Sequence, residues 1–191
     1  MTASPKKRPR NAAATRDAIL QSAIAAFARA GYDGVGVREI AGDAGVTAMM
    51  VNRYFGSKEK LFAEAVEAAF APSVVVPDDS RSLAHDAAVN VVGATTPGPA
   101  YQIMLRSVSN PGALAIVRDA ISRHVGRRLA RQLPEPGRSL RNEMMLSVIA
   151  GIFMMRGIIA SRALTQTDPE RLERLVEAVF ESIIETPLPG P

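Results

Sequence analysis

The 191-residue chain contains no cysteine and no tryptophan, and it has only two histidines, His85 and His124. The absence of cysteine excludes a disulfide framework, a thiolate zinc site and a cysteine nucleophile, and it favours a reducing, cytoplasmic compartment. Two histidines so far apart in the sequence do not make a metal site, so we expect neither a metal nor a cofactor. The motifs Glu-x-x-His and His-Glu-x-x-His are also missing. The sequence therefore gives no support to the alternative of an enzyme built on a helical bundle.

Long apolar runs are also absent. No run reaches the ~18 residues that a membrane-spanning helix requires. The longest candidate, residues 144–155, is flanked by Arg141 and Glu143 on one side and by Arg156 on the other. We expect it to be a buried helix. The N-terminus carries charges but lacks the apolar segment of a signal peptide, so we expect a cytoplasmic protein that does not contact a membrane.

Positive charge is concentrated at the N-terminus. Lys6, Lys7, Arg8 and Arg10 lie in the first ten residues without any acidic residue, and because the net charge is +4, the rest of the chain sums to zero. Together with two prolines and an alanine-rich run, this composition predicts a disordered basic arm over residues 1–14. Such an arm can follow DNA phosphates or enter a minor groove, and the alternative is a solubilising tail.

Residues 37–62 have the pattern of two short helices joined by a tight turn and followed at once by a third helix. Apolar residues at helical spacing from Val37 to Ala44 give the first helix one buried stripe. Gly45 is suited to the turn because glycine adopts positive φ without steric penalty, and Thr47 is suited to be the N-cap of the second helix. This pattern is typical of a helix-turn-helix, whose second helix enters the DNA major groove. Short helical hairpins also occur in proteins that do not bind DNA, so spacing alone leaves both readings open.

Helices are predicted on both sides of this segment. Thr15 is the expected N-cap of a first amphipathic helix that ends at Gly31, and Ser57 is the expected N-cap of a helix over residues 58–70. Lys58 in that helix's first turn opposes the helix dipole unless an anion such as a DNA phosphate lies nearby. The predicted DNA-binding domain therefore spans residues 15–72, and the proline-bounded stretch up to residue 80 is the expected domain boundary.

The rest of the chain, residues 80–186, also has helical periodicity. Helices are predicted over residues 82–92, 101–108, 113–133 and 141–164, and a last one opens at Asp168. The helix over 141–164 is apolar on nearly all sides, so one side must be covered by other protein, most simply by a second subunit. We therefore expect an all-α fold of about nine helices, with a helix-turn-helix domain followed by a helical regulatory and dimerisation domain.

The N-terminal part resembles the tetracycline-repressor (TetR) family of transcriptional regulators. The stretch AFARAGYDGVGVREIAGDAGVTAMMVNRYFGSKEKLF follows the family pattern almost throughout, and the resemblance covers roughly residues 15 to 70. It departs at Gly36, where the family usually has a Ser or Thr cap, and in the unusually apolar run 48–50. The resemblance implies a homodimeric DNA-binding regulator, most simply a repressor released from a palindromic double-stranded operator by a small hydrophobic effector. A DNA-binding protein without an effector is the alternative.

The predicted DNA contacts fall into two groups. Contacts that position the protein on phosphates are expected from Thr47, Tyr54 and Lys58 together with Arg53, and Arg38 is expected in the interface as well. Contacts that read bases are expected from the recognition helix, by analogy with the family, at Ala48, Met49, Met50 and Asn52. Asparagine pairs with adenine and apolar side chains meet thymine methyl groups, so an A/T-leaning half-site is predicted.

The predicted ligand site and dimer interface lie in the second domain. Soft and aromatic side chains, with one histidine as a polar anchor, suggest a pocket lined by Tyr101, Met104, Met144, Phe153 and His85, although methionine at helical spacing is also typical of plain core. The resemblance implies that the last two helices pair with their twofold mates. The residues expected in this interface are Ser147, Gly151, Met154, Ile158, Leu175, Val179 and Ile183.

Overall fold

The computed structural model describes residues 12–71, 82–94 and 96–189, and the secondary-structure elements within these ranges are all helices. In chain order they are α1 (Ala12–Ala30), α2 (Val37–Asp43), α3 (Ala48–Phe55), α4 (Lys58–Phe70), α5 (Leu83–Gly93), α6 (Pro99–Ser107), α7 (Pro111–Ile121), the π-helical turn η1 (Ser122–Gly126), α8 (Arg127–Gln132), α9 (Arg138–Phe153), the π-helical turn η2 (Met154–Ile158), α10 (Arg162–Thr165) and α11 (Pro169–Glu185). The all-α prediction is confirmed.

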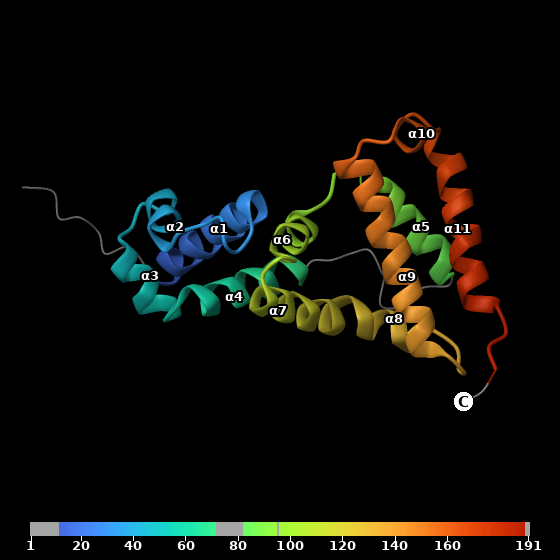
Figure 1. Cartoon of the computed structure of the whole chain (residues 1–191), viewed down its shortest axis with the longest axis horizontal. Helices are drawn as coiled ribbons and strands as arrows, with labels where there is room; N and C mark the ends of the chain where they lie inside the picture. The colour runs from blue at the N-terminus through green and yellow to red at the C-terminus, as the bar shows by residue number, and fades with distance from the viewer. Residues whose placement is uncertain (1–11, 72–81, 95, 190–191) are drawn as a thin grey trace, which may run out of the picture.

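The helices form an elongated molecule with two ends (Figure 1). Helices α1 to α4 make one end, α5, α9 and α11 make the other, and α6 and α7 lie between them. The number of segments exceeds the expected nine partly because the predicted helix over 113–133 is divided by the π turn η1 into α7 and α8. None of the helices within the described ranges is both long enough and apolar enough to cross a membrane.

The N-terminal bundle is built around an aromatic cluster. The ring of Phe27 on α1 packs edge-on against Phe62 on α4 with 4.9 Å between ring centroids, and Tyr32 packs against Phe62 at 5.0 Å. Helix α1 begins at Ala12, so the prediction that Thr15 is its N-cap is wrong. The preceding alanines are strong helix formers that extend the helix, and Thr15 is buried inside it. The predicted arm can therefore extend no further than residue 11, and residues 1–11 lie outside the described ranges.

The turn between α2 and α3 has the predicted geometry. Gly45 adopts a φ of +65°, and its neighbour Val46 donates its backbone N–H to the Ala41 carbonyl at 2.9 Å. Val51 and Phe55 on α3 are buried, which fixes the face that the helix turns toward the bundle. Ser57 caps α4 as predicted, because its Oγ accepts the N–H of Lys60 at 3.1 Å.

The second domain differs from prediction where α9 ends. The predicted helix over 141–164 stops at Phe153, passes through η2, and reverses direction near Ala160, whose φ is +54°. The physical reason is a close approach between η2 and the loop before α6. A Cβ on Gly157 would lie 2.3 Å from the ring of Pro97, so the backbone itself packs on that ring. At the start of α11, Asp168 is the N-cap as expected, because its carboxylate accepts the N–H of Arg171 at 3.1 Å.

Arg141 has a structural role that the sequence did not reveal. Its side chain is buried, and its guanidinium donates to the carbonyl oxygens of Ile183 and Thr186, the latter at 2.8 Å. These carbonyls lie at the C-terminal end of α11, where a helix has unpaired acceptors and a partial negative charge. Arg141 therefore joins the start of α9 to the end of α11.

Candidate nucleic-acid interface and ligand pocket

Helix α3 lies at the outer end of the N-terminal bundle (Figure 1). Met49 is 80% exposed, and Asn52 and Arg53 are exposed beside it. Met50 is half-buried. Ala48 and Tyr54, also predicted to contact DNA, are half-buried and pack partly against the core, so they offer less surface than the sequence suggested.

Two predicted phosphate-contacting side chains lie at helix N-termini. Thr47 occupies the N-cap position of α3, but its hydroxyl does not make the expected capping bond there and is exposed. The Lys58 ammonium, in the first turn of α4, lies over the ring of Tyr32 at 4.5 Å from the centroid. This cation–π contact offsets the unfavourable interaction of the ammonium with the dipole of α4. Both groups are thus positioned to meet an anion.

The contact of Lys58 with Tyr32 was not predicted, although Tyr32 directly follows the glycine at the end of α1. Burial, together with the nearby charges of Glu59 and Asp33, raises the pKa of its phenol, so the ring stays neutral beneath Lys58. Arg38 on α2 is exposed, and neither it nor Arg53 has an ion-pair partner in the described part of the chain. The predicted contacts Lys6, Lys7, Arg8 and Arg10 lie outside the described residues.

Hydrogen bonds connect the residues that follow α1 to the end of α6 and the start of α7. Tyr32 donates its backbone N–H to Ser107 Oγ at 3.2 Å, and Asn110 Nδ2 donates to the Asp33 carboxylate at 2.9 Å. Asn110 also caps α7 by accepting the N–H of Ala113. The backbone of Gly31 lies directly against Arg106, since a Cβ on this glycine would be 2.2 Å from the Arg106 carbonyl oxygen.

A second set of contacts joins α4 to η1. The Glu67 carboxylate pairs with His124 Nε2 at 2.6 Å and with the guanidinium of Arg123 at 3.0 Å. Arg123 also pairs with Asp119 one turn earlier. Arg123 is therefore one of the residues that hold α4 against the second domain.

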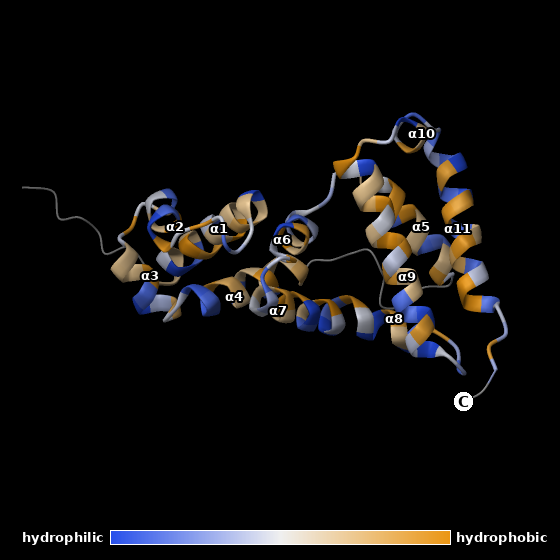
Figure 2. Ribbon diagram, viewed as in Figure 1, coloured by the Kyte–Doolittle hydropathy of each residue, from blue (hydrophilic) through white to orange (hydrophobic). Residues whose placement is uncertain are grey.

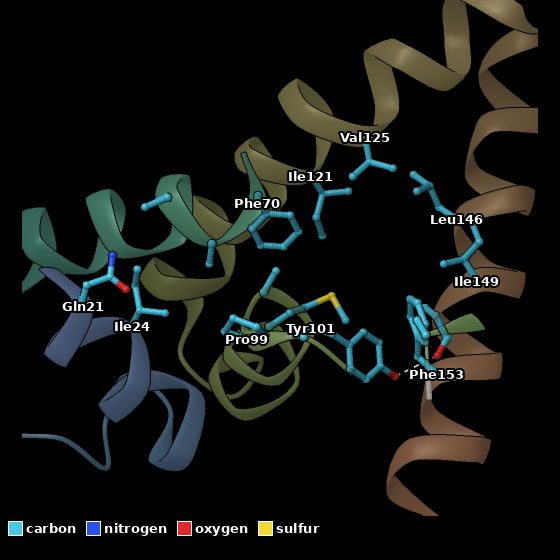
Figure 3. Close-up of a pocket in the computed structure, with 17 residues that line it drawn as sticks. Gln21, Ile24, Phe70, Pro99, Tyr101, Ile121, Val125, Leu146, Ile149 and Phe153 are labelled. Atoms are coloured by element: carbon cyan, nitrogen blue, oxygen red, sulfur yellow. Dashed lines mark hydrogen bonds between the residues drawn. The ribbon is translucent and has the colours of Figure 1, made fainter. Parts of the chain in front are cut away.

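A cavity of about 550 Å³ lies between the two domains (Figure 3). Its walls come from α1 and α4 of the N-terminal bundle and from α6, α7, η1 and α9 of the second domain. Of the predicted ligand-binding residues, Tyr101, Met104 and Phe153 line it. The rings of Tyr101 and Phe153 pack edge-on at 5.5 Å on the same side of the cavity.

Two predicted ligand-binding residues, Met144 and His85, do not line this cavity. Met144 is 47% exposed, on a face of α9 turned away from the cavity. His85 lies on the outer side of α5, where its Nδ1 bonds to the Glu177 carboxylate of α11 at 3.1 Å. That hydrogen bond and the charge of Glu177 raise the pKa of His85. The sequence shows that such residues are helical, but only the packing of the helices decides which way they face.

The helices predicted to dimerise have large exposed apolar side chains. Leu175 is 63% exposed on α11, where apolar and hydrophilic residues alternate (Figure 2), and Val179 is 40% exposed one turn later. On α9 and η2, Met154 and Ile158 are exposed in the same way, with Ser147 exposed and Gly151 half-buried. Ile183 is different, because it is half-buried and packs against the core of its own protomer.

Comparison with known proteins gives the family. The profile of the tetracyclin repressor-like C-terminal domain matches residues 82–184, and that of the bacterial regulatory proteins of the tetR family matches residues 19–65. Over 64 residues the chain is 39% identical to the HTH-type transcriptional repressor NicS of Pseudomonas putida, a match that covers 34% of this chain and only 30% of NicS.

Solved structures share the fold. A TetR-family regulator from Streptomyces coelicolor A3 superposes with a TM-score of 0.60 at 23% identity, covering 94% of this chain and 99% of the other. The multidrug binding protein EbrR, in complex with ethidium, superposes with a TM-score of 0.64 at 19% identity over 91% of this chain and 99% of EbrR. The family match, the helix-turn-helix and the all-α architecture lead to one conclusion: the chain belongs to the TetR family of DNA-binding transcriptional regulators, and it is not an enzyme.

Proposed function

We propose that this regulator is a homodimeric repressor that leaves a palindromic operator when a small hydrophobic ligand enters the cavity between its domains. The observation that carries the proposal is the shared wall of that cavity. Gln21 and Ile24 on α1 and Phe70 on α4 face it from the DNA-binding bundle, while Tyr101 and Phe153 face it from the second domain (Figure 3). A ligand in this cavity contacts both domains at once.

Dimerisation is supported by the exposed apolar side chains on α9, η2 and α11. Soluble monomers rarely expose large contiguous apolar patches, and a twofold axis lets one such patch cover another copy of itself. A dimer of this kind presents two copies of α3, one for each half of a palindrome. Such a regulator acts on DNA in the cytoplasm, and the cations around α3 and α4 attract the operator's phosphates.

The mechanism of release follows from the position of α4. This helix carries Lys58 at its N-terminus and lines the cavity with Ala68, Ala69 and Phe70 near its C-terminus. A ligand that fits better when α4 is shifted favours that shifted state, and it changes the separation of the two copies of α3. To change the operator-bound population from mostly bound to mostly free, the ligand needs a differential affinity of about 10⁴-fold between the two states.

The relatives agree with this proposal. NicS is a repressor, and EbrR forms complexes with proflavin and ethidium. A regulator without an effector shares the DNA-binding domain but does not explain a cavity of about 550 Å³ with walls from both domains. Cavities of this size accommodate drug-sized molecules.

A pocket-filling variant tests the coupling without knowledge of the ligand. Ala68 is half-buried in the cavity wall on α4, so Ala68→Phe places a ring where the ligand would lie. The matched control is Ala63→Phe, because Ala63 is equally half-buried on the same helix but does not line the cavity. We expect Ala68→Phe to weaken operator binding at least tenfold in fluorescence anisotropy and the control to leave it within threefold. Equal affinities for the two variants would contradict the proposed coupling.

A further inference from the structure

We infer that the ligand of this cavity is an uncharged, ring-sized molecule, and that cavity chemistry discriminates against cations such as those that EbrR binds. The inference rests on the proposed function, because it names the ligand class for the same cavity. Among the 17 described residues that line the cavity, only Gln21 and Tyr101 have polar side-chain atoms. Within the described part of the chain, this wall has no carboxylate, ammonium or guanidinium group.

The Tyr101 hydroxyl, on the second-domain side of the cavity, already has a hydrogen-bond partner within the protein. Tyr101 donates its hydroxyl proton to the Ala150 carbonyl at 2.8 Å, so its oxygen can only accept a further hydrogen bond. Burial raises the pKa of this phenol, and it therefore does not ionise to supply a counter-charge for a cation. Gln21, by contrast, is exposed on α1 and offers an amide that can both donate and accept.

The carboxylates of α4 that lie nearest in sequence to the wall are paired with other side chains. On α4, Glu67 directly precedes the lining residues but is paired with His124 and Arg123, and Glu64 is paired with Arg16 on α1. A cation that entered the cavity would lose hydration without gaining a counter-ion, and an anion would do the same. Cation–π attraction to the rings of Phe70, Tyr101 and Phe153 compensates for only part of this lost hydration. An uncharged ligand loses little hydration and gains contact with the apolar wall.

The geometry therefore assigns an orientation to the ligand. Its apolar rings lie between Phe70 and the pair formed by Tyr101 and Phe153, and its one polar group faces Gln21 (Figure 3). A hydrogen-bond donor on the ligand is also accommodated at the Tyr101 oxygen. The Gln21 amide and the Tyr101 oxygen thus determine which polar groups of a ligand the cavity can bind.

Three probes with the same ring skeleton test the charge preference. Acridine is uncharged at pH 8, proflavin is a protonated acridine at that pH, and acridine-9-carboxylate is an anion. Binding of each to the full-length protein is measured by the change in probe fluorescence. We expect acridine to bind at least tenfold more tightly than either charged probe. Proflavin or the carboxylate binding within threefold of acridine would overturn the inference, as would the failure of acridine to bind up to its solubility limit.

A charge placed in the wall gives the reciprocal test. Met104 is half-buried in the cavity wall on α6, so Met104→Glu adds a carboxylate to that wall. The control is Val108→Glu, which adds the same charge at an exposed position at the end of α6, outside this cavity. Met104→Glu is expected to raise proflavin affinity at least tenfold relative to acridine, and the control is expected to change neither. An unchanged preference in Met104→Glu would contradict the assigned site.

The same samples separate the ligand class from the proposed function. Operator binding is followed by anisotropy with and without saturating acridine. Preferential acridine binding that leaves operator affinity unchanged would overturn the release mechanism while supporting the charge preference of the cavity. Equal binding of the three probes, together with release from the operator, would overturn the charge preference and keep the mechanism.

Discussion

The contact between Gly31 and α6 gives a quantitative test of how the two domains are joined. Gly31 has a φ of +72°, and a Cβ at this position would lie 2.2 Å from the Arg106 carbonyl oxygen and 2.8 Å from its carbon. Gly31→Ala is therefore expected to destabilise the protein in two ways. Alanine in the left-handed region costs about 1–2 kcal/mol, and relieving the overlap with the α6 backbone adds about 1–3 kcal/mol.

Gly137→Ala is the matched control. Gly137 also has positive φ, at +89°, but the atom that its Cβ would meet at 2.3 Å is Cδ1 of Leu188, the end of a flexible side chain. Both variants have the conformational cost of alanine at positive φ, but only Gly31→Ala also has the overlap with the α6 backbone. The difference between their losses of stability therefore measures the contribution of the contact between Gly31 and α6. The expected difference of about 1–3 kcal/mol corresponds to about 2–12 °C in Tm for a chain of this length. Thermal unfolding at one protein concentration measures it, and equal losses in the two variants would refute the reasoning.

Three further predictions concern the second domain. Replacing Leu175 and Val179 together by aspartate puts charges into the exposed apolar face of α11, so we expect monomers in light scattering while circular dichroism stays helical. Arg141→Met removes both charge-assisted bonds to the end of α11 and leaves carbonyls without a partner, so we expect a loss of about 2–4 kcal/mol in urea unfolding. The raised pKa of His85 means that its ion pair with Glu177 stabilises the fold fully below the usual pKa of 6.5 and is lost as pH rises through the raised value. The Tm advantage of the wild type over His85→Gln should therefore be largest at pH 5.5 and vanish by pH 8.5.

The features that the sequence predicted well depend on neighbours along the chain. Gly45 needs only a turn with positive φ, and Ser57 needs only the N–H of Lys60 three residues later. The burial of Val51 and Phe55 follows from helical spacing on one short segment. Local geometry of this kind, combined with the family pattern, was enough to place the recognition helix.

The features that the sequence missed depend on contacts between distant helices. Nothing near Asn110 indicates that it bonds to Asp33, 77 residues away, and nothing near Arg141 indicates that it reaches the end of α11. The same reason explains why the position of Met144 outside the cavity was not predicted, since its helix has apolar residues on nearly all sides and so gives no signal of which side faces the cavity. Thr15 failed as a cap because the alanines before it form helix as readily as the residues after it.

Operator binding by the dimer tests the central claim most directly. Fluorescence anisotropy compares the DNA upstream of the gene with scrambled DNA of equal length at several salt concentrations, and light scattering gives the molar mass of the same samples. We expect selective binding by a dimer, with Lys58→Ala reducing the magnitude of the salt slope by about 2, one for each protomer's lost phosphate contact. Absence of binding to either DNA at low salt, or selective binding by a monomer with an unchanged slope in Lys58→Ala, would contradict the account.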